Sequence, residues 1–152
     1  MRARNLAEPY PFVSTDDSAV EAARLLAERS LPALLVLDAD GLPNAVVPGS
    51  QLIRQILPSY VLDDPQLAAV VDEQHMAEAS ERLGNLTVAE WLPPHVFPPP
   101  MVGPDARPME VAALMARSHS PLVAVIERGS SRVTLLGSVT AARLMRHFTG
   151  AR

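Results

Sequence analysis

The stretch LPALLVLDADG, residues 31–41, combines a proline, five consecutive apolar residues and a turn. The uninterrupted run at 33–37 is typical of a strand buried on both faces, and the Asp-Gly pair after it is typical of a tight turn. The apolar residues 45–47 predict a second strand, and residues 50–57 predict a helix. This stretch therefore predicts a strand, a turn, a strand and a closing helix, in this order.

Two further elements precede this stretch. Residues 12–15 (FVST) predict a short extended segment. A helix follows, for which Ser18 is the predicted cap and Glu21 completes the S-x-x-E pattern of a capping box. The first third of the chain is thus predicted to fold as β-α-β-β-α.

The same order returns near the C-terminus. A shift of 89 residues aligns eight identical residues without a gap, including Asp16 with Asp105 and Pro32 with Pro121, and a shift of 92 continues the match after a longer turn. Chance alignment of two Ala- and Leu-rich helices is the alternative, but the order of turns and strands repeats as well. The segments leading into the copies also match, since ARNL (3–6) resembles AEWL (89–92).

The second copy is predicted from the same signals. Pro108 stands at a first helical position, 122–126 and 133–139 predict two strands, and 141–148 predict the last helix. Neither copy is long enough to bury its sheet alone. The predicted fold is therefore α/β (α+β), with two pseudo-symmetric repeats packed sheet to sheet around one core.

A helical insertion separates the copies. Asp64 and Pro65 are suitable residues for a helix start, and a helix is predicted over about 65–83, whereas the proline-rich residues 93–100 predict an extended connector. The predicted domains are repeat 1 at 1–58, a helical insertion at 59–86 and repeat 2 at 87–152.

Composition excludes several classes of function. The 152 residues carry a net charge of −4, which argues against a nucleic-acid partner, and the absence of cysteine excludes thiolate catalysis. No membrane insertion or secretion signal is predicted, so a cytoplasmic location is expected. Asp72, His75 and Glu78 recur every three residues, but a solvated helix face explains them better than a metal site. No catalytic constellation and no metal site are predicted, so the chain is not expected to be an enzyme.

The segments LPALLVLDADG and VTLLGSVTAARLM (133–145), with the duplicated order of elements, resemble a tandem CBS domain pair, or Bateman module. The pattern is similar to that of a stand-alone bacterial CBS-pair protein. The resemblance implies a regulatory module that binds AMP, ADP, ATP or S-adenosylmethionine in clefts between the repeats. It also implies a homodimer and an unknown regulated protein, such as a transporter or an enzyme.

The family's ligand motif is altered in both copies. The motif ends in a Thr or Ser followed, three residues later, by an Asp that holds the ribose hydroxyls. Copy two has Thr140 but Arg143 at the Asp position, and copy one has Pro48 and Gln51. Arg143 cannot accept a hydrogen bond, so it suits an anion better than a ribose. A salt bridge is the alternative role of Arg143, as a helix cap is that of Thr140.

The resemblance places candidate ligand contacts in the loops, at the strand starts and at the closing helices. Helix capping is the alternative for Asp16 and Asp105, and core packing for the apolar candidates. The candidates are Ser14, Thr15, Asp16, Ala33, Leu34, Pro48, Gln51, Gly103, Asp105, Ser120, Leu122, Thr140 and Arg143.

Two functions remain open. The first is a sensor of a small adenine-containing or anionic metabolite that passes the change to a partner protein. The second is a dimeric interaction scaffold with degenerate, non-binding nucleotide sites. In the second case the inserted helix and the region of Trp91, expected to be exposed, are candidate partner surfaces.

Overall fold

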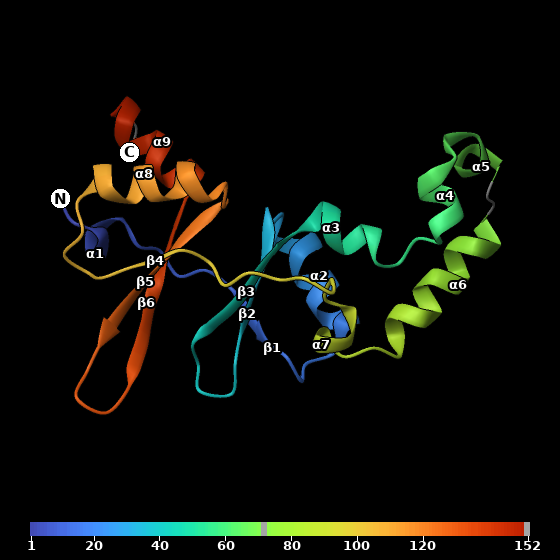
Figure 1. The fold of residues 1–152 in the computed structure, drawn as a ribbon, viewed down its shortest axis with the longest axis horizontal. Helices are drawn as coiled ribbons and strands as arrows, with labels where there is room; N and C mark the ends of the chain where they lie inside the picture. Colours follow the sequence, from blue (N-terminus) through green and yellow to red (C-terminus); the bar gives the residue numbers. More distant parts are fainter. Residues whose placement is uncertain (71–72, 151–152) are drawn as a thin grey trace. The chain divides into compact units, whose positions relative to one another are not determined.

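The computed structural model describes residues 1–70 and 73–150 (Figure 1). It confirms the predicted β-α-β-β-α order in both copies and adds a short helix before each. The first copy contains α1 (Ala3–Leu6), β1 (Phe12–Ser14), α2 (Ala19–Arg29), β2 (Ala33–Leu37), β3 (Pro43–Pro48) and α3 (Gly49–Arg54). The second contains α7 (Val88–Trp91), β4 (Met101–Val102), α8 (Pro108–Ser118), β5 (Leu122–Arg128), β6 (Val133–Thr140) and α9 (Ala141–Thr149).

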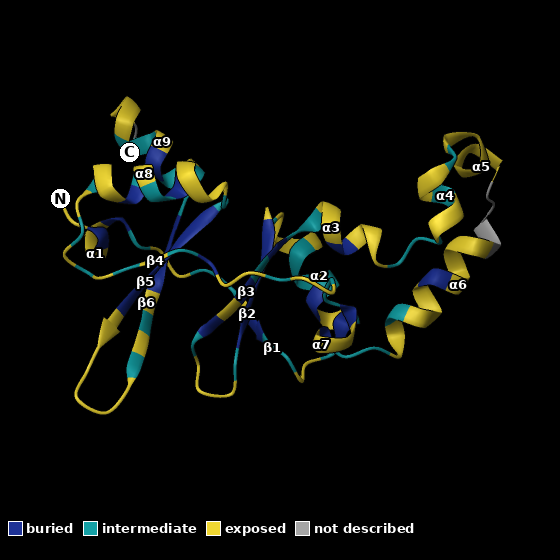
Figure 2. Cartoon of the chain, viewed as in Figure 1, coloured by how far each residue is buried: buried dark blue, intermediate teal, exposed yellow. Residues whose placement is uncertain are grey.

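The strands form two three-stranded sheets, ordered β1-β2-β3 and β4-β5-β6. In the second sheet β4 runs parallel to β5, and β6 runs antiparallel to β5 with Leu122 opposite Thr140. All five residues of β2 are buried, as are residues 122–126 of β5 (Figure 2). These are the two uninterrupted apolar runs, so the prediction of fully buried central strands is confirmed.

The chain divides into two compact units, and each contains parts of both copies. One unit comprises residues 1–12, 35–46 and 97–152, and the other comprises 13–34 and 47–96. The core of the first unit is aliphatic, as the low aromatic content requires. One buried cluster of this unit draws its members from α1, α8, β5, β6 and α9: Ala3, Leu6, Val111, Met115, Val123, Val125, Val139 and Leu144.

The first leader, α1, docks on the second copy. The N–H of Ala3 donates to the carbonyl of Ala106 at 2.7 Å, and that of Arg4 donates to Pro104 at 3.0 Å. Leu6 is fully buried in the core that α8, β5, β6 and α9 form. The N-terminal residues therefore complete a cluster whose other buried members all follow residue 110.

The second leader, α7, makes the equivalent contacts with the first copy. The N–H of Val88 donates to Asp17 at 2.8 Å and that of Ala89 donates to Thr15 at 3.0 Å. Thr15 and Asp17 lie 89 residues before Pro104 and Ala106, the acceptors of α1, and 89 is the shift between the two copies. Each leader thus packs against the other copy, and this exchange is one reason why the compact units do not follow the repeats.

The exchange also corrects the alignment of the leaders. Ala3 is structurally equivalent to Val88, a shift of 85, whereas matching ARNL with AEWL aligned Ala3 with Ala89. That alignment was wrong by one residue because it matched Leu6 to Leu92. The residue that occupies the buried position of Leu6 is Trp91, which is 4% exposed.

A capping box begins α7. The Thr87 hydroxyl accepts a hydrogen bond from the Glu90 N–H, and the Glu90 carboxylate accepts one from the Thr87 N–H at 2.9 Å. The backbone hydrogen bond from Thr87 is the main cause that lowers the pKa of the Glu90 carboxyl. A lowered pKa means that the ionised form stabilises α7 above the ordinary carboxyl pKa, and that this contribution is lost as the pH falls. The predicted cap Ser18 likewise accepts from the Glu21 N–H at 3.4 Å.

The insertion contains more helices than expected. The structure has α4 (Ser59–Asp63), α5 (Pro65–Val70) and α6 (Glu73–Gly84). The helix predicted over 65–83 corresponds to α5 and α6, with residues 71 and 72 outside the described part of the chain, and α4 was not predicted. Asp64 accepts a hydrogen bond from the Gln66 N–H, in line with its predicted capping role. Across 1–70 and 73–150, no helix has the length and apolar character needed to cross a bilayer.

Candidate functional site

The junction between β6 and α9 is built around Thr140. Its hydroxyl caps α9 by accepting a hydrogen bond from the Arg143 N–H at 3.1 Å. The next N–H, that of Ala141, donates to the carbonyl of Pro121 at 3.2 Å, which joins the start of α9 to the start of β5. The first copy repeats this arrangement, since Gly49 donates to Pro32 at 3.4 Å, but Pro48 offers no side-chain cap.

Ser138 lies two residues before Thr140 on the same face of β6, because alternate residues of a strand share a face. It is 1% exposed, and among the described residues its hydroxyl has no hydrogen-bond partner. Val139 points the other way, into the core. Leaving a buried hydroxyl unpaired costs about 1–3 kcal/mol, so this group is available for a hydrogen bond from outside the described chain.

The leader approaches the same strand closely. Glu8 and Ser138 exchange two backbone hydrogen bonds of 3.0 Å in an antiparallel bridge. A Cβ placed on Gly137 would lie 2.8 Å from the Glu8 carbonyl oxygen, which is closer than atoms can pack. A glycine is therefore required at 137 for the backbone of Glu8 to reach β6.

Arg143 is not free at this junction. Its Nε lies 3.6 Å from Oε1 of Glu8, and Nη2 of Arg146 donates to the same oxygen at 2.9 Å. This is the salt bridge that the sequence left as the alternative role of Arg143. The sequence did not identify Glu8 and Arg146, since no pattern links residue 8 to α9. A hollow of about 570 Å³ opens beside them, lined by Met1, Asn5, Glu8, Arg143, Arg146, His147 and Gly150.

The candidates after β1 are held by local hydrogen bonds. The Ser14 N–H donates to the Asp17 carboxylate at 2.8 Å, and the exposed Asp16 donates its N–H to the Ser14 hydroxyl. Thr15 accepts the bond from α7 described above. Ser18, and not Asp16, is the cap of α2, so capping was the wrong alternative for Asp16.

The candidates after β4 are arranged differently. Gly103 is exposed, and its carbonyl accepts a hydrogen bond from Ala106. Asp105 forms an ion pair with Arg4 of the leader, and Arg107 occupies the cap position of α8. The capping alternative was therefore wrong for Asp105 as well.

The remaining candidates belong mainly to the core and the backbone. Ala33, Leu34 and Leu122 are fully buried, which agrees with their alternative role in packing. The Ser120 hydroxyl donates to the Leu122 carbonyl at 2.7 Å. Gln51 is an exposed residue of α3. The structure thus brings Leu122 and Thr140 together with Ser138, and Arg143 together with Glu8.

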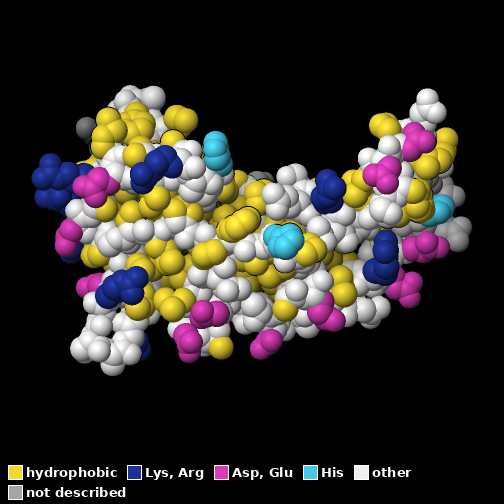
Figure 3. All heavy atoms as spheres, viewed as in Figure 1, with side chains coloured by type: hydrophobic (Ala, Val, Ile, Leu, Met, Phe, Trp, Pro, Cys, Tyr) yellow, Lys and Arg dark blue, Asp and Glu magenta, His cyan; other side chains and the backbone are white. Residues whose placement is uncertain are grey.

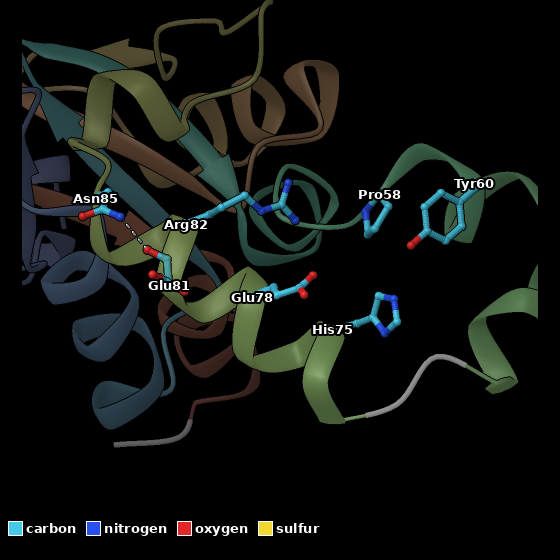
Figure 4. A pocket seen from close by; sticks show the side chains of 7 residues that line it. All are labelled: Pro58, Tyr60, His75, Glu78, Glu81, Arg82 and Asn85. Carbon is cyan, nitrogen blue, oxygen red and sulfur yellow. Dashed lines mark hydrogen bonds between the residues drawn. The ribbon is translucent and has the colours of Figure 1, made fainter.

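The insertion has a hollow of its own. It measures about 520 Å³ and is lined by residues of α4 and α6 and their ends, among them Tyr60, His75 and Glu78 (Figure 4). Asp72, the first of the three residues Asp72, His75 and Glu78 considered as metal ligands from the sequence, lies outside the described residues. Within the described part, no three His, Asp or Glu side chains are grouped as a metal ion would require.

Trp91 is not a surface residue. The indole is buried, and its Nε1 donates a hydrogen bond to the Leu52 carbonyl at 3.2 Å. The expectation of an exposed partner surface at Trp91 was wrong, because the exchanged leader α7 inserts this side chain into the unit formed with the first copy.

Comparison with known proteins identifies the family. The model of the CBS domain matches residues 3–57. The crystal structure of a CBS domain-containing protein of unknown function from Kribbella flavida is 42% identical in sequence. The match covers 98% of this chain and 99% of that chain, with a TM-score of 0.87. The chain belongs to the CBS-domain family.

More distant structures share the fold. One is CBSX2 in complex with AMP, at 16% identity, with 98% and 96% of the two chains covered and a TM-score of 0.64. Another is the CBS domain of a bacterial CNNM/CorC family Mg²⁺ transporter in complex with ATP, at 16% identity, with 100% and 89% covered and a TM-score of 0.64. No curated protein matches the sequence. The fold is that of a CBS domain pair.

Proposed function

We propose that this chain is a regulatory CBS-pair module that binds a small adenine-containing or anionic metabolite at the junction of β6 and α9. The observation that carries the proposal is the buried Ser138 hydroxyl, which finds no partner among residues 1–70 and 73–150 and lies on the same strand face as Thr140. Two structures of this fold hold AMP and ATP, which supports an adenine nucleotide as the ligand class. Binding rather than catalysis is the usual role of CBS domains.

The groups at this junction suit a ligand with a planar polar ring. Thr140 and Ser138 offer hydroxyls on one face of β6, and the start of β5 at Leu122 lies opposite Thr140 in the sheet. A ring that accepted a hydrogen bond from Ser138 would remove the cost of the unpaired hydroxyl. Such a site gains affinity from a group that the free protein leaves unsatisfied.

The leader provides a route from ligand to partner. Its Glu8 is hydrogen-bonded to Ser138, and its Leu6 belongs to the core beneath β6. A ligand that binds one arrangement of the β6–α9 junction more tightly than another shifts the population of leader positions. The regulated protein would recognise this difference.

Ser138→Ala separates binding from folding. The free variant is expected to melt at the same temperature as the wild type or higher, because an unpaired buried hydroxyl is removed. The rise in melting temperature with AMP, ADP, ATP or S-adenosylmethionine is expected to be smaller in the variant. For the wild type, ligand at 100 times its Kd should add about 2.7 kcal/mol of stability.

Differential scanning fluorimetry provides this measurement, and Ser131→Ala, an exposed position in the β5–β6 turn, is the matched control. The adenine form of the proposal is contradicted if none of the four compounds raises the melting temperature at millimolar concentration. It is also contradicted if Ser138→Ala and wild type show equal shifts.

A second candidate function, a dimeric interaction scaffold, is favoured by the arm, defined as α4, α5 and α6. The structure places no buried residue in α4 or α5. Large apolar side chains are exposed along the arm, including Leu67, Val70 and Met76, and Figure 3 shows hydrophobic groups among acidic ones there. Helices of five and six residues are marginal in water without packing, so we expect a protein surface to cover them.

We propose a second copy of the chain as this partner. Residues 58–85 hold six acidic residues and one arginine, a net charge of −5, which leaves +1 on the rest of the chain. The rest of a second copy is therefore less acidic than the arm, which favours contact between the arm and that part of the copy. Val70→Glu is expected to raise the dimer Kd by about tenfold or more, since burying an unpaired charge costs a few kcal/mol.

Light scattering after gel filtration, over a concentration series, checks this expectation. Gln66→Glu adds the same charge at an exposed polar position of α5 and is expected to change the dimer Kd far less. A wild-type chain that stays monomeric at every concentration would exclude the scaffold function and leave the sensor function standing.

A further inference from the structure

The first turn of α9 carries a cation at a position where three other helices of the fold carry an acid. The third residues of α2, α7 and α8 are Glu21, Glu90 and Glu110, whereas α9 has Arg143. The positive end of the helix dipole favours an acid in this turn and disfavours a cation. Local breaks of this kind are expected where function requires the residue.

The geometry around Arg143 shows two guanidinium groups that share one carboxylate. Glu8 accepts from Arg146 at 2.9 Å and lies 3.6 Å from Nε of Arg143, so the pairing with Arg143 is the looser one. The Arg143 side chain is 21% exposed, and Arg143 lines the hollow of about 570 Å³ together with His147. Two guanidinium groups carry more N–H donors than one carboxylate can accept, so donors remain that an anion could use.

Glu8 resembles an internal substitute for that anion. Its backbone is fixed on β6 by two hydrogen bonds, and Gly137 permits the close approach. Its side chain, however, is 47% exposed and can leave the arginines without moving the bridge. A carboxylate and a phosphate offer the same paired oxygens to a guanidinium fork.

We infer that this hollow binds a phosphate or phosphate-ester group, which displaces the Glu8 carboxylate from between Arg143 and Arg146. The inference deepens the proposed function and rests on it only where the phosphate belongs to an adenine nucleotide. Inorganic phosphate and a nucleotide phosphate share the recognised chemistry. The Glu8 carboxylate then competes with the phosphate for the two arginines and lowers the affinity of the hollow for phosphate.

Titration calorimetry of the full chain with inorganic phosphate, AMP and adenosine, at fixed pH and low ionic strength, tests the inference. Glu8→Gln is expected to tighten phosphate and AMP binding roughly 2- to 30-fold, because each exposed ion pair that the ligand displaces is worth a factor of about 1.4–5. Arg146→Gln is expected to weaken both roughly tenfold or more through loss of a charge-assisted hydrogen bond.

Arg117→Gln, an exposed arginine of α8, is the matched control and is expected to leave both affinities unchanged. Arg146→Lys keeps the charge without the fork and should give an intermediate affinity, and a melting curve shows that each variant is folded. Equal phosphate affinity in wild type and Glu8→Gln overturns the inference. AMP binding that is insensitive to Arg146→Gln also overturns it, and leaves the proposed function standing. If phosphate binding depends on Arg146 and AMP binds no more tightly than inorganic phosphate, the inference is supported. The adenine form of the proposed function is then contradicted.

Discussion

Trp91→Ala is expected to lower the free energy of unfolding by about 3–5 kcal/mol, the range for deleting a large buried aromatic side chain. The indole is 4% exposed and donates its Nε1 hydrogen bond to the Leu52 carbonyl. It is also the last residue of α7, the leader that docks on Thr15 and Asp17. The variant loses apolar contact, leaves a cavity and removes the donor of a buried hydrogen bond. Urea denaturation followed by circular dichroism measures the loss.

Phe97→Ala is the matched control, because this aromatic residue lies in the connector and is 77% exposed. Its effect is expected to stay within about 0.5 kcal/mol. Trp91→Phe keeps most of the ring and should fall between the two variants. A decrease of less than about 1 kcal/mol in the free energy of unfolding of Trp91→Ala would be too small for the deletion of a buried aromatic side chain. It would show that this side chain is not buried in the folded protein.

Gly137→Ala is expected to destabilise the chain by about 1–3 kcal/mol, as overpacking of a fixed site does. The new Cβ would lie 2.8 Å from the Glu8 carbonyl oxygen. This oxygen cannot move aside easily, because the backbone of Glu8 is held by two hydrogen bonds to Ser138. Relief requires the leader to retreat from β6. Thermal and urea denaturation give the change in stability, and hydrogen exchange of the Ser138 amide reports the loss of the bridge.

Gly49→Ala is the control for this substitution. A Cβ at Gly49 would have no neighbour within 4 Å, and the residue begins α3, where alanine is favourable. Its stability is expected to equal or slightly exceed that of the wild type. If Gly137→Ala is as stable as Gly49→Ala, the close approach of Glu8 to β6 is not a feature of the folded protein.

Most of the fold could be predicted because its signals are local. The buried runs in β2 and β5 need no knowledge of the partner strand, and proline at the start of α8 sets the helix by its own geometry. The leaders could not be placed in this way. Four-residue helices carry almost no periodic pattern, and the bonds from Ala3 to Ala106 depend on contacts far apart in sequence. The position of Trp91 followed from that exchange and was therefore missed.

The site could be predicted only in part for the same reason. Thr140 is marked by the change from strand to helix, and its cap is a bond across three residues. The partner of Arg143 is Glu8 in the opposite end of the chain, and the bond from Arg146 to Glu8 spans 138 residues. The unpaired state of Ser138 depends on what surrounds it in space. A single sequence carries no local signal for either feature.

The exchanged leader fixes an order of events during synthesis. Residues 1–8 are synthesised well before their acceptors at Pro104, Ala106 and Ser138. At about 5–20 residues per second, roughly 5–30 s pass before Ser138 exists. For this interval the apolar side chain of Leu6 and the carboxylate of Glu8 have no docking surface, so residues 1–8 of the nascent chain are expected to stay exposed to solvent, chaperones and proteases. Docking of α1 and Glu8 onto the second copy ends this exposure.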